Sequence, residues 1–116
     1  MAAALAVLGG KTGRKVAVLG DMLELGVCAT AEHYRVGRIA AEKADMLLAF
    51  GPNSGRMISG AITGGMPEKM AKAFEDREEM AAAMKRMIKP GDVILVKGSR
   101  GMRMEKILDL FLKDET

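Results

Sequence analysis

Three short apolar runs mark the predicted strands of the chain, and each run is continuous rather than alternating. They are Lys15–Leu19, Met46–Phe50 and Asp92–Val96. Continuous apolar runs of this length are typical of parallel strands that are covered on both faces. A fourth segment, Lys69–Phe74, alternates imperfectly and carries two lysines. It predicts an edge strand, because charges on an edge discourage pairing with other molecules.

Five segments between and around these runs are predicted to be helical. They are Met1–Leu8, Thr30–Lys43, Asn53–Ile62, Asp76–Ile88 and Met104–Leu112. Thr30, Asn53 and Asp76 have side chains that accept hydrogen bonds from the free amides of a helix start, so each is predicted as an N-cap. Glu79, three residues after Asp76, resembles the second half of a capping box.

Strands that alternate with helices predict an α/β fold, namely a Rossmann-like, mostly parallel sheet with helices on both faces. No repeat, linker or low-complexity tract interrupts the pattern, so residues 1–116 are expected to form a single domain. The common doubly wound topology predicts the strand order 3-2-1-4, and ligands of such sheets bind outside the carboxyl ends of the strands. This rule selects three loops, at Gly20–Ala29, Gly51–Gly55 and Lys97–Arg103.

Composition excludes several classes of protein and site. The single cysteine, Cys28, forms no internal disulfide, which suits a reducing cytosol, and one His with one Cys argues against a classical zinc site. The net charge is only +3, and three Phe, one Tyr and no Trp offer little for stacking bases, so no nucleic-acid partner is expected. No apolar run reaches the roughly 18 residues of a membrane-spanning helix, so no membrane association is expected.

Gly10-Lys11-Thr12 looks like the end of a phosphate-binding P-loop, but the rest of that motif is missing. A P-loop follows a strand and needs a glycine at the position of Leu5, which lies in a predicted helix. The first predicted strand is also not followed by the G-x-G-x-x-G fingerprint of dinucleotide-binding sheets. We therefore expect no nucleotide-cradling loop in this chain.

The loop after the first predicted strand carries two carboxylates, Asp21 and Glu24. One interpretation is structural: Asp21 caps a turn and Glu24 is solvated. The other is functional: both hold a substrate ammonium group or the charge near a reacting amine. The sequence leaves both open. His33, near the start of the next helix, is expected to be a packed, neutral imidazole, with a subsidiary role in orienting the Asp21 loop.

The loop after the last predicted strand gathers positive charge beside two glycines, Gly98 and Gly101. It leads into a helix N-terminus, whose free amides favour anions. Arg100 can grip a carboxylate or phosphate with two hydrogen bonds, Lys97 can act as a point charge, and Ser99 can donate one more hydrogen bond. A solvated basic loop is the alternative. Because cations near a helix start oppose the helix dipole, their presence favours a binding role.

Two long motifs in these loops resemble the C-terminal domain of the Mur ligases. They are Val16–Gly26 (VAVLGDMLELG), followed by His33 and Gly37, and Asp92–Lys106 (DVILVKGSRGMRMEK). The resemblance extends over essentially the whole chain, although the middle part, Met57–Met87, matches only in layout.

The resemblance implies a piece of a three-domain ligase of cytoplasmic peptidoglycan synthesis, one that adds D-alanyl-D-alanine to UDP-N-acetylmuramoyl-tripeptide. In that family, ATP and Mg²⁺ activate a peptide carboxylate as an acyl phosphate, which the incoming amine then attacks. The family's P-loop, magnesium ligands and UDP-binding domain lie upstream of this domain, which closes over the central domain. The fragment alone is therefore expected to be inactive and to hold no cofactor of its own.

The resemblance also implies roles for individual residues. The implied substrate-binding residues are Asp21, Glu24, Lys97, Ser99 and Arg100. The two carboxylates are implied near the attacking amine, and the other three near the substrate carboxylate or the transferring phosphate. His33 and Arg103 are candidates for supporting roles, and no catalytic residue or metal ligand is assigned. The alternative is a stand-alone α/β module whose basic loop binds an anionic metabolite without chemistry.

Overall fold

Four parallel strands form the centre of the molecule in a computed structural model that describes residues 1–23 and 25–113. The strands are β1 (Lys15–Gly20), β2 (Met46–Phe50), β3 (Ala71–Phe74) and β4 (Val93–Lys97). Their order in the sheet is β3-β2-β1-β4, and each neighbouring pair is parallel. The predicted α/β fold and the strand order 3-2-1-4 are confirmed, with β3 at one edge.

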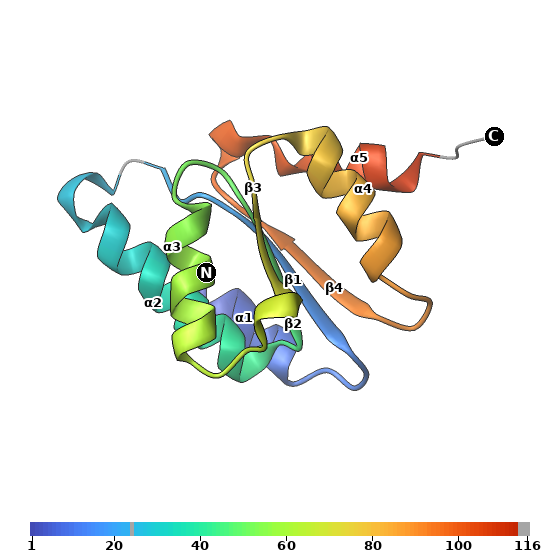
Figure 1. Ribbon diagram of the computed structural model, residues 1–116, viewed down its shortest axis with the longest axis horizontal. Helices are drawn as coiled ribbons and strands as arrows, with labels where there is room; N and C mark the ends of the chain where they lie inside the picture. The colour runs from blue at the N-terminus through green and yellow to red at the C-terminus, as the bar shows by residue number, and fades with distance from the viewer. Residues whose placement is uncertain (24, 114–116) are drawn as a thin grey trace.

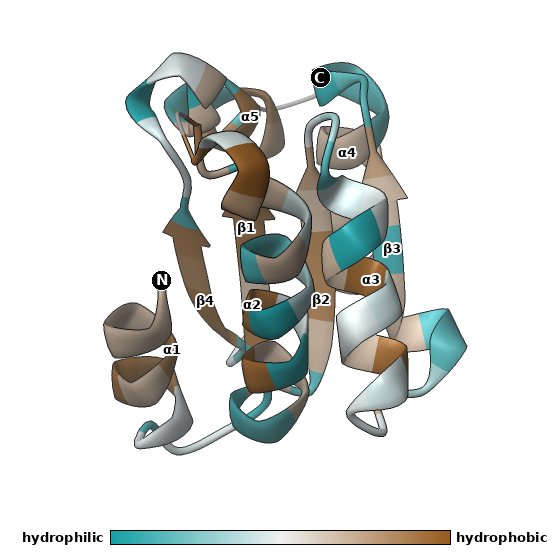
Figure 2. Cartoon of the chain, turned by 90° about the vertical axis from the view of Figure 1, so that its left-hand side faces the viewer, coloured by the Kyte–Doolittle hydropathy of each residue, from teal (hydrophilic) through white to brown (hydrophobic). Residues whose placement is uncertain are grey.

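In the described residues, five helices cover the two faces of this sheet. They are α1 (Ala2–Gly9), α2 (Ala29–Lys43), α3 (Ser54–Thr63), α4 (Arg77–Met87) and α5 (Met104–Leu112), with one-turn 3-10 helices η1 (Gly26–Cys28), η2 (Glu68–Met70) and η3 (Arg100–Met102). The first three helices lie on one face and the last two on the other (Figures 1 and 2). In the described part of the chain, no helix is long and apolar enough to cross a membrane.

Right-handed crossovers explain this division of the helices. The chain moves through α2 and α3 from the middle of the sheet to the β3 edge, then returns through α4 to the β4 edge. Because strand–helix–strand crossovers are right-handed, a reversal of direction places the next helix on the opposite face. Because all neighbouring strands are parallel, the carboxyl ends of the four strands lie at the same end of the sheet, which is at the top in Figure 2.

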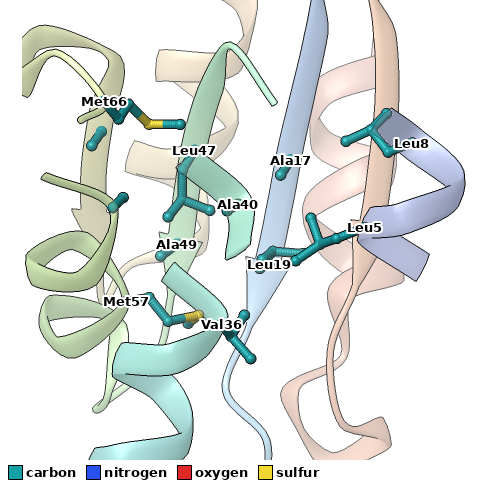
Figure 3. Close-up of a cluster of buried hydrophobic side chains, with 12 residues drawn as sticks. Leu5, Leu8, Ala17, Leu19, Val36, Ala40, Leu47, Ala49, Met57 and Met66 are labelled. Atoms are coloured by element: carbon teal, nitrogen blue, oxygen red, sulfur yellow. The ribbon is translucent and has the colours of Figure 1, made fainter. Parts of the chain in front are cut away.

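The alternation of side chains along each central strand builds a core on both faces. In β1, Ala17 and Leu19 face the α1–α3 layer, where Leu5 also packs (Figure 3). Val16 and Val18 face the α4–α5 layer. Both faces of β1 are covered from Val16 to Leu19, so a polar side chain at any of these four positions would be buried, which is why this run is continuously apolar.

Two glycines allow α2 and α3 to pack in backbone contact. A Cβ atom at Gly37 of α2 would lie 1.9 Å from the Met57 carbonyl oxygen, and one at Gly60 of α3 would lie 2.0 Å from the Tyr34 carbonyl oxygen. Neither distance is available to a carbon atom. The interface therefore requires glycine at both positions, although both residues are helical.

Helix starts differ from the sequence predictions in two of three cases. Asp76 is confirmed as the N-cap of α4, where its carboxylate accepts from the Glu78 amide at 2.7 Å and the Glu79 amide at 3.1 Å. Thr30 was wrongly predicted as a cap: it lies inside α2, because η1 leads directly into that helix and places Cys28 at the N-cap position. Asn53 occupies the N-cap position of α3 without a side-chain cap.

β4 was predicted as a strand buried on both faces, and this part of the prediction is wrong. The strand spans Val93–Lys97, and its apolar residues are only partly buried. It lies at the edge of the sheet, so only β1 pairs with it among the strands of the structure. The edge position therefore reduces the burial of an apolar run that the sequence alone cannot distinguish from a central strand.

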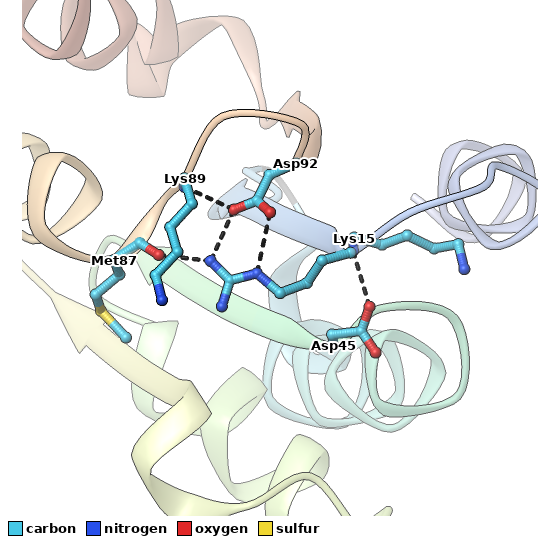
Figure 4. Close-up of polar contacts among 6 residues, drawn as sticks. Lys15, Asp45, Met87, Lys89 and Asp92 are labelled. Carbon is cyan, nitrogen blue, oxygen red and sulfur yellow. Dashed lines mark hydrogen bonds and ion pairs between the residues drawn. The ribbon is translucent and has the colours of Figure 1, made fainter.

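A polar cluster ties β1 to β4 at the end of the sheet opposite the strand carboxyl ends (Figure 4). Arg14 donates from Nε and Nη2 to the two carboxylate oxygens of Asp92, at 3.1 and 2.7 Å, and also to the Met87 carbonyl at 2.6 Å. The Lys89 amide donates to the same carboxylate at 2.8 Å. One carboxylate therefore joins the start of β1 to the turn between α4 and β4.

Candidate functional site

Three loops meet at the carboxyl ends of β1, β2 and β4. The Asp21 amide donates to the Phe50 carbonyl at 3.0 Å, and the Ser99 amide donates to the Asp21 carbonyl at 3.1 Å. These main-chain bonds continue the sheet pattern past the ends of the strands. The three loops that the strand-end rule selected from the sequence therefore form one connected cluster.

Asp21 lies inside this cluster and not on its surface. The residue is 1% exposed, and its carboxylate accepts from the Asn53 backbone amide at 2.9 and 3.1 Å and from the Asn53 side-chain amide at 2.9 Å. Asn53 precedes α3, so the carboxylate supplies the capping charge at the positive end of that helix. Its contacts support the structural interpretation of Asp21. Asn53, predicted to cap through its own side chain, donates to Asp21 instead.

His33 is fully buried in α2, and both of its ring nitrogens have partners. Nε2 accepts from the Met22 amide at 2.9 Å, and Nδ1 lies 2.6 Å from the Ala29 carbonyl oxygen. An amide only donates and a carbonyl only accepts, so this arrangement assigns the proton to Nδ1 and leaves the ring neutral. The contacts agree with the interpretation of His33 as a packed, neutral residue that orients the loop after β1.

Ser99 links the first and last loops through its side chain as well as its main chain. Its hydroxyl oxygen accepts from the Leu23 amide at 2.7 Å. A hydroxyl that accepts one hydrogen bond can still donate its own hydrogen, so Ser99 can fix the loop and bind an acceptor at once. Glu24, the next residue of the first loop, lies outside the described residues, and its role stays a prediction.

Lys97 and Arg100 are exposed beside an open hollow of about 370 Å³ at the end of β4. The loop and the start of α5 line it together: Val96, Lys97, Gly98, Ser99, Arg100, Met104, Glu105 and Leu108. Two cations and a hydroxyl outweigh the one carboxylate of this lining, Glu105, and so favour an anion, and Arg100 can pair two hydrogen bonds with a carboxylate or phosphoryl group. The three residues predicted for anion binding are thus brought together, while Arg103 is exposed at the start of α5.

The two glycines of the basic loop have packing reasons of their own. A Cβ at Gly98 would lie 3.0 Å from the Gly20 Cα, and a Cβ at Gly101 would lie 2.6 Å from a methyl carbon of Leu23. From the sequence, these glycines were predicted to allow close approach of a ligand. In the structure they first allow the last loop to approach the first loop.

Two residues of the cluster were not singled out from the sequence. Asn53 was considered only as a helix cap, and Arg77 was not considered at all. Arg77 donates from Nη2 to the Met102 carbonyl at 2.8 Å, and its guanidinium carbon lies 5.1 Å from the centre of the Phe50 ring. One signal could have found it: Arg77 is the first residue of α4, where a positive charge opposes the helix dipole.

Among the described residues, the structure shows neither a metal-binding cluster of side chains nor a P-loop. Within residues 1–23 and 25–113, no group of three or more His, Cys, Asp or Glu side chains could hold a metal. Gly10-Lys11-Thr12 lies between the end of α1 and the start of β1. A P-loop follows a strand, so this segment is not one, as the sequence predicted.

Comparison with known proteins agrees with this fold. The family model described as "Mur ligase, glutamate ligase domain" matches residues 1–100. The UDP-N-acetylmuramoyl-tripeptide–D-alanyl-D-alanine ligase of Treponema pallidum is 38% identical over 101 residues, which cover 86% of this chain and 22% of that protein. The Escherichia coli protein of the same name is 35% identical over 111 residues, or 93% of this chain and 23% of its own length.

Solved structures show the same similarity in three dimensions. A crystal structure of MurF from Acinetobacter baumannii matches with a TM-score of 0.83 and 34% identity, covering 96% of this chain and 25% of that one. MurF ligase from Thermotoga maritima, in complex with ADP, matches with a TM-score of 0.75 and 28% identity over 92% of this chain and 23% of that one. This chain therefore spans about a quarter of the length of such relatives. Sequence and structure together show that the chain belongs to the Mur ligase family and corresponds to its C-terminal domain.

Proposed function

We propose that residues 1–116 are the C-terminal, substrate-positioning domain of a cytoplasmic, ATP-dependent ligase that joins D-alanyl-D-alanine to UDP-N-acetylmuramoyl-tripeptide. The relatives named above carry this activity in their names, and the chain covers about a quarter of their length. The proposal therefore includes a central ATP-binding domain and an N-terminal UDP-binding domain outside these residues. The observation that carries it is the cluster of strand-end loops, which presents Lys97, Ser99 and Arg100 around one open hollow.

The proposed task of this cluster is to position substrate groups against the upstream domains. Arg100 and Lys97 bind the substrate carboxylate or the transferring phosphoryl group, and Ser99 donates a further hydrogen bond. The proposed role of Glu24 is to stabilise the charge of the incoming amine. Asp21 acts through the loops, because its carboxylate is buried against Asn53. Held in place before the reaction, such charges favour the transition state without the cost of reorganising solvent.

ATP and Mg²⁺, which the family uses to activate the carboxylate, do not fit the described residues of this chain. These residues offer no metal-binding group of side chains, and the only glycine-lysine-threonine segment follows a helix. We assign the ATP and Mg²⁺ sites to the upstream domains, and the proposed contribution of residues 1–116 is to position the substrate anion against them. We accordingly expect the isolated chain to release no phosphate from ATP in the presence of both substrates.

Substitution of Arg100 in the complete ligase tests the proposal. Arg100→Ala removes a paired donor to the substrate anion, so kcat/KM is expected to fall about tenfold to a hundredfold, while ATP binding is unchanged. Arg86→Ala is the matched control, because Arg86 is an exposed arginine in the last turn of α4, outside the lining of the hollow. Wild-type kinetics for Arg100→Ala, or equal losses in both variants, would contradict the proposed role of the basic loop.

The coding sequence upstream of Met1 provides a second, independent test. An open frame that encodes a P-loop after a strand supports the ligase proposal. A stop codon directly before Met1 contradicts it, and the chain would then act as a stand-alone module that binds an anionic metabolite. That outcome predicts that the isolated chain binds inorganic phosphate or a small carboxylate, with chemical-shift changes confined to Lys97–Arg103.

A further inference from the structure

Arg77 connects three elements at the carboxyl edge of the sheet through a single guanidinium group. It is the first residue of α4. Its Nη2 donates to the carbonyl of Met102, the last residue of η3, at 2.8 Å. Its guanidinium carbon lies 5.1 Å from the ring centre of Phe50, the last residue of β2, within the range of a cation–π contact.

The stability of α4 does not explain an arginine at this position. A positive charge at a helix start opposes the helix dipole, and the first turn of α4 is otherwise acidic, with Glu78 and Glu79. The Nε of Arg77 is also buried without a hydrogen-bond partner, and no other side-chain nitrogen or oxygen in the described residues shares this condition. A buried unsatisfied donor destabilises a folded protein. Helix stability therefore does not account for Arg77, and we look for its role in where the guanidinium group is placed.

The main chain that Arg77 holds is the turn between two cationic residues of the proposed site. Met102 follows Arg100 by two residues and precedes Arg103, whose backbone is left-handed with a φ of 50°. The side chain of Met102 packs against the loop after β2, where a Cβ at Gly51 would lie 3.1 Å from its sulfur atom. Packing fixes this turn on one side, and the hydrogen bond from Arg77 fixes its carbonyl.

We propose that Arg77 is a positioning residue that determines where Arg100 is presented to the substrate anion. This inference rests on the proposed function, in which the basic loop binds that anion. Arg77 touches no substrate; it acts through the carbonyl of Met102. Loss of the guanidinium allows the turn to shift, and small shifts of a binding group reduce its contribution to the transition state.

The test uses the complete ligase with Arg77→Gln and Arg77→Lys. Both variants lose the planar group that reaches the Met102 carbonyl and the Phe50 ring together, so kcat/KM is expected to fall about tenfold. Arg77→Lys keeps the positive charge but lacks the guanidinium group, so its kcat/KM tests the same point if the Arg77→Gln variant does not fold. Arg14→Gln is the matched control, because Arg14 binds a carbonyl at the other end of α4, that of Met87. It is expected to lower Tm and leave kcat/KM unchanged.

A double substitution distinguishes positioning from a general structural effect. If Arg77 acts through Arg100, Arg77→Gln added to Arg100→Ala is expected to lower kcat/KM by less than about twofold more, because the group it positions is already gone. A further tenfold loss in that background, or wild-type kinetics for Arg77→Gln beside a slowed Arg100→Ala, overturns the inference alone. Wild-type kinetics for Arg100→Ala overturns the proposed function and this inference with it.

Discussion

Asp21 carries a carboxylate into the interior of the loop cluster, where, among the described residues, its hydrogen bonds come from the backbone and side-chain amides of Asn53. Asp21→Asn turns an amide group toward these donors, and the lost acceptor leaves a buried N–H unsatisfied. We expect the free energy of unfolding to fall by about 1–3 kcal/mol. Chemical denaturation of the wild-type and variant chains measures this difference.

Asp45→Asn provides the control for this prediction. Asp45 also accepts from a backbone amide, that of Lys15 at 2.8 Å, but it does so at an exposed position. Water can replace that bond, so a loss of a few tenths of a kcal/mol up to about 1 kcal/mol is expected. If Asp21→Asn is no more destabilising than Asp45→Asn, the buried carboxylate does not hold the loops together.

At the residue scale, the sequence predicted which loops lie together but not the contacts between their residues. Asp21, Ser99 and Arg100 were selected because they follow strands, and strand ends are visible in the apolar pattern. The bond between Asp21 and Asn53 joins residues 32 positions apart, and it depends on β1 and β2 being neighbours in the sheet. A carboxylate can bind a substrate ammonium group or the start of a helix equally well, so the identity of Asp21 alone does not show which partner it has.

At the scale of elements, the contact between α2 and α3 depends on glycine in each helix. Gly60→Ala would place a Cβ atom 2.0 Å from the Tyr34 carbonyl oxygen, so the two helices must move apart. We expect the free energy of unfolding to fall by about 1–3 kcal/mol, the usual cost of overpacking. Thermal or urea unfolding of the variant chain checks this value.

Gly55→Ala in the same helix is the matched control. Gly55 lies in the first turn of α3, and nothing lies within 4 Å of a Cβ atom built there. Alanine is a better helix former than glycine, so this variant is expected to be more stable by about 0.5–1 kcal/mol. The prediction fails if the two alanine variants change stability in the same direction by similar amounts.

The elements themselves were predicted with different success, for physical reasons. β2 and α5 have the predicted bounds, Met46–Phe50 and Met104–Leu112, because sharp changes in polarity mark both ends. The start of α2 was misplaced at Thr30, since a side chain able to cap a helix does not show that it does so. The run at β4 was read as fully buried, because apolar residues at a sheet edge carry the same letters as those in its centre.

At the scale of the whole molecule, the strand order decides which residues meet. The order 3-2-1-4 was adopted because it is common in doubly wound sheets, and nothing in the sequence itself requires it. Once it holds, the loops after β1, β2 and β4 lie next to one another. Arg77 enters this cluster from α4 on the opposite face from α2. Its contacts with Phe50 and Met102 follow from that packing, and the pattern of apolar and polar residues around Arg77 does not predict them.

The cluster that ties β1 to β4 makes the stability of the whole chain depend on pH. The hydrogen bond from Arg14 lowers the pKa of the Asp92 carboxyl below its ordinary value of 3.8 and raises the pKa of the Arg14 guanidinium. The folded chain therefore holds the proton on Asp92 less tightly than the unfolded chain does. This contribution to stability is complete above pH 3.8 and is lost as the pH falls through the lowered pKa of the folded state.

Asp92→Asn isolates this contribution from that of the other carboxylates. At about pH 7 the variant is expected to unfold with a free energy about 1–3 kcal/mol lower than the wild type, because Arg14 and the Lys89 amide lose a charged acceptor. Because protonation removes the same charge from the wild type, the difference should narrow as the pH falls below about 4. Urea unfolding across this range measures it, with exposed Asp109→Asn as the control. If the difference in the free energy of unfolding between wild type and variant is equal at low and neutral pH, the negative charge of Asp92 does not stabilise the fold.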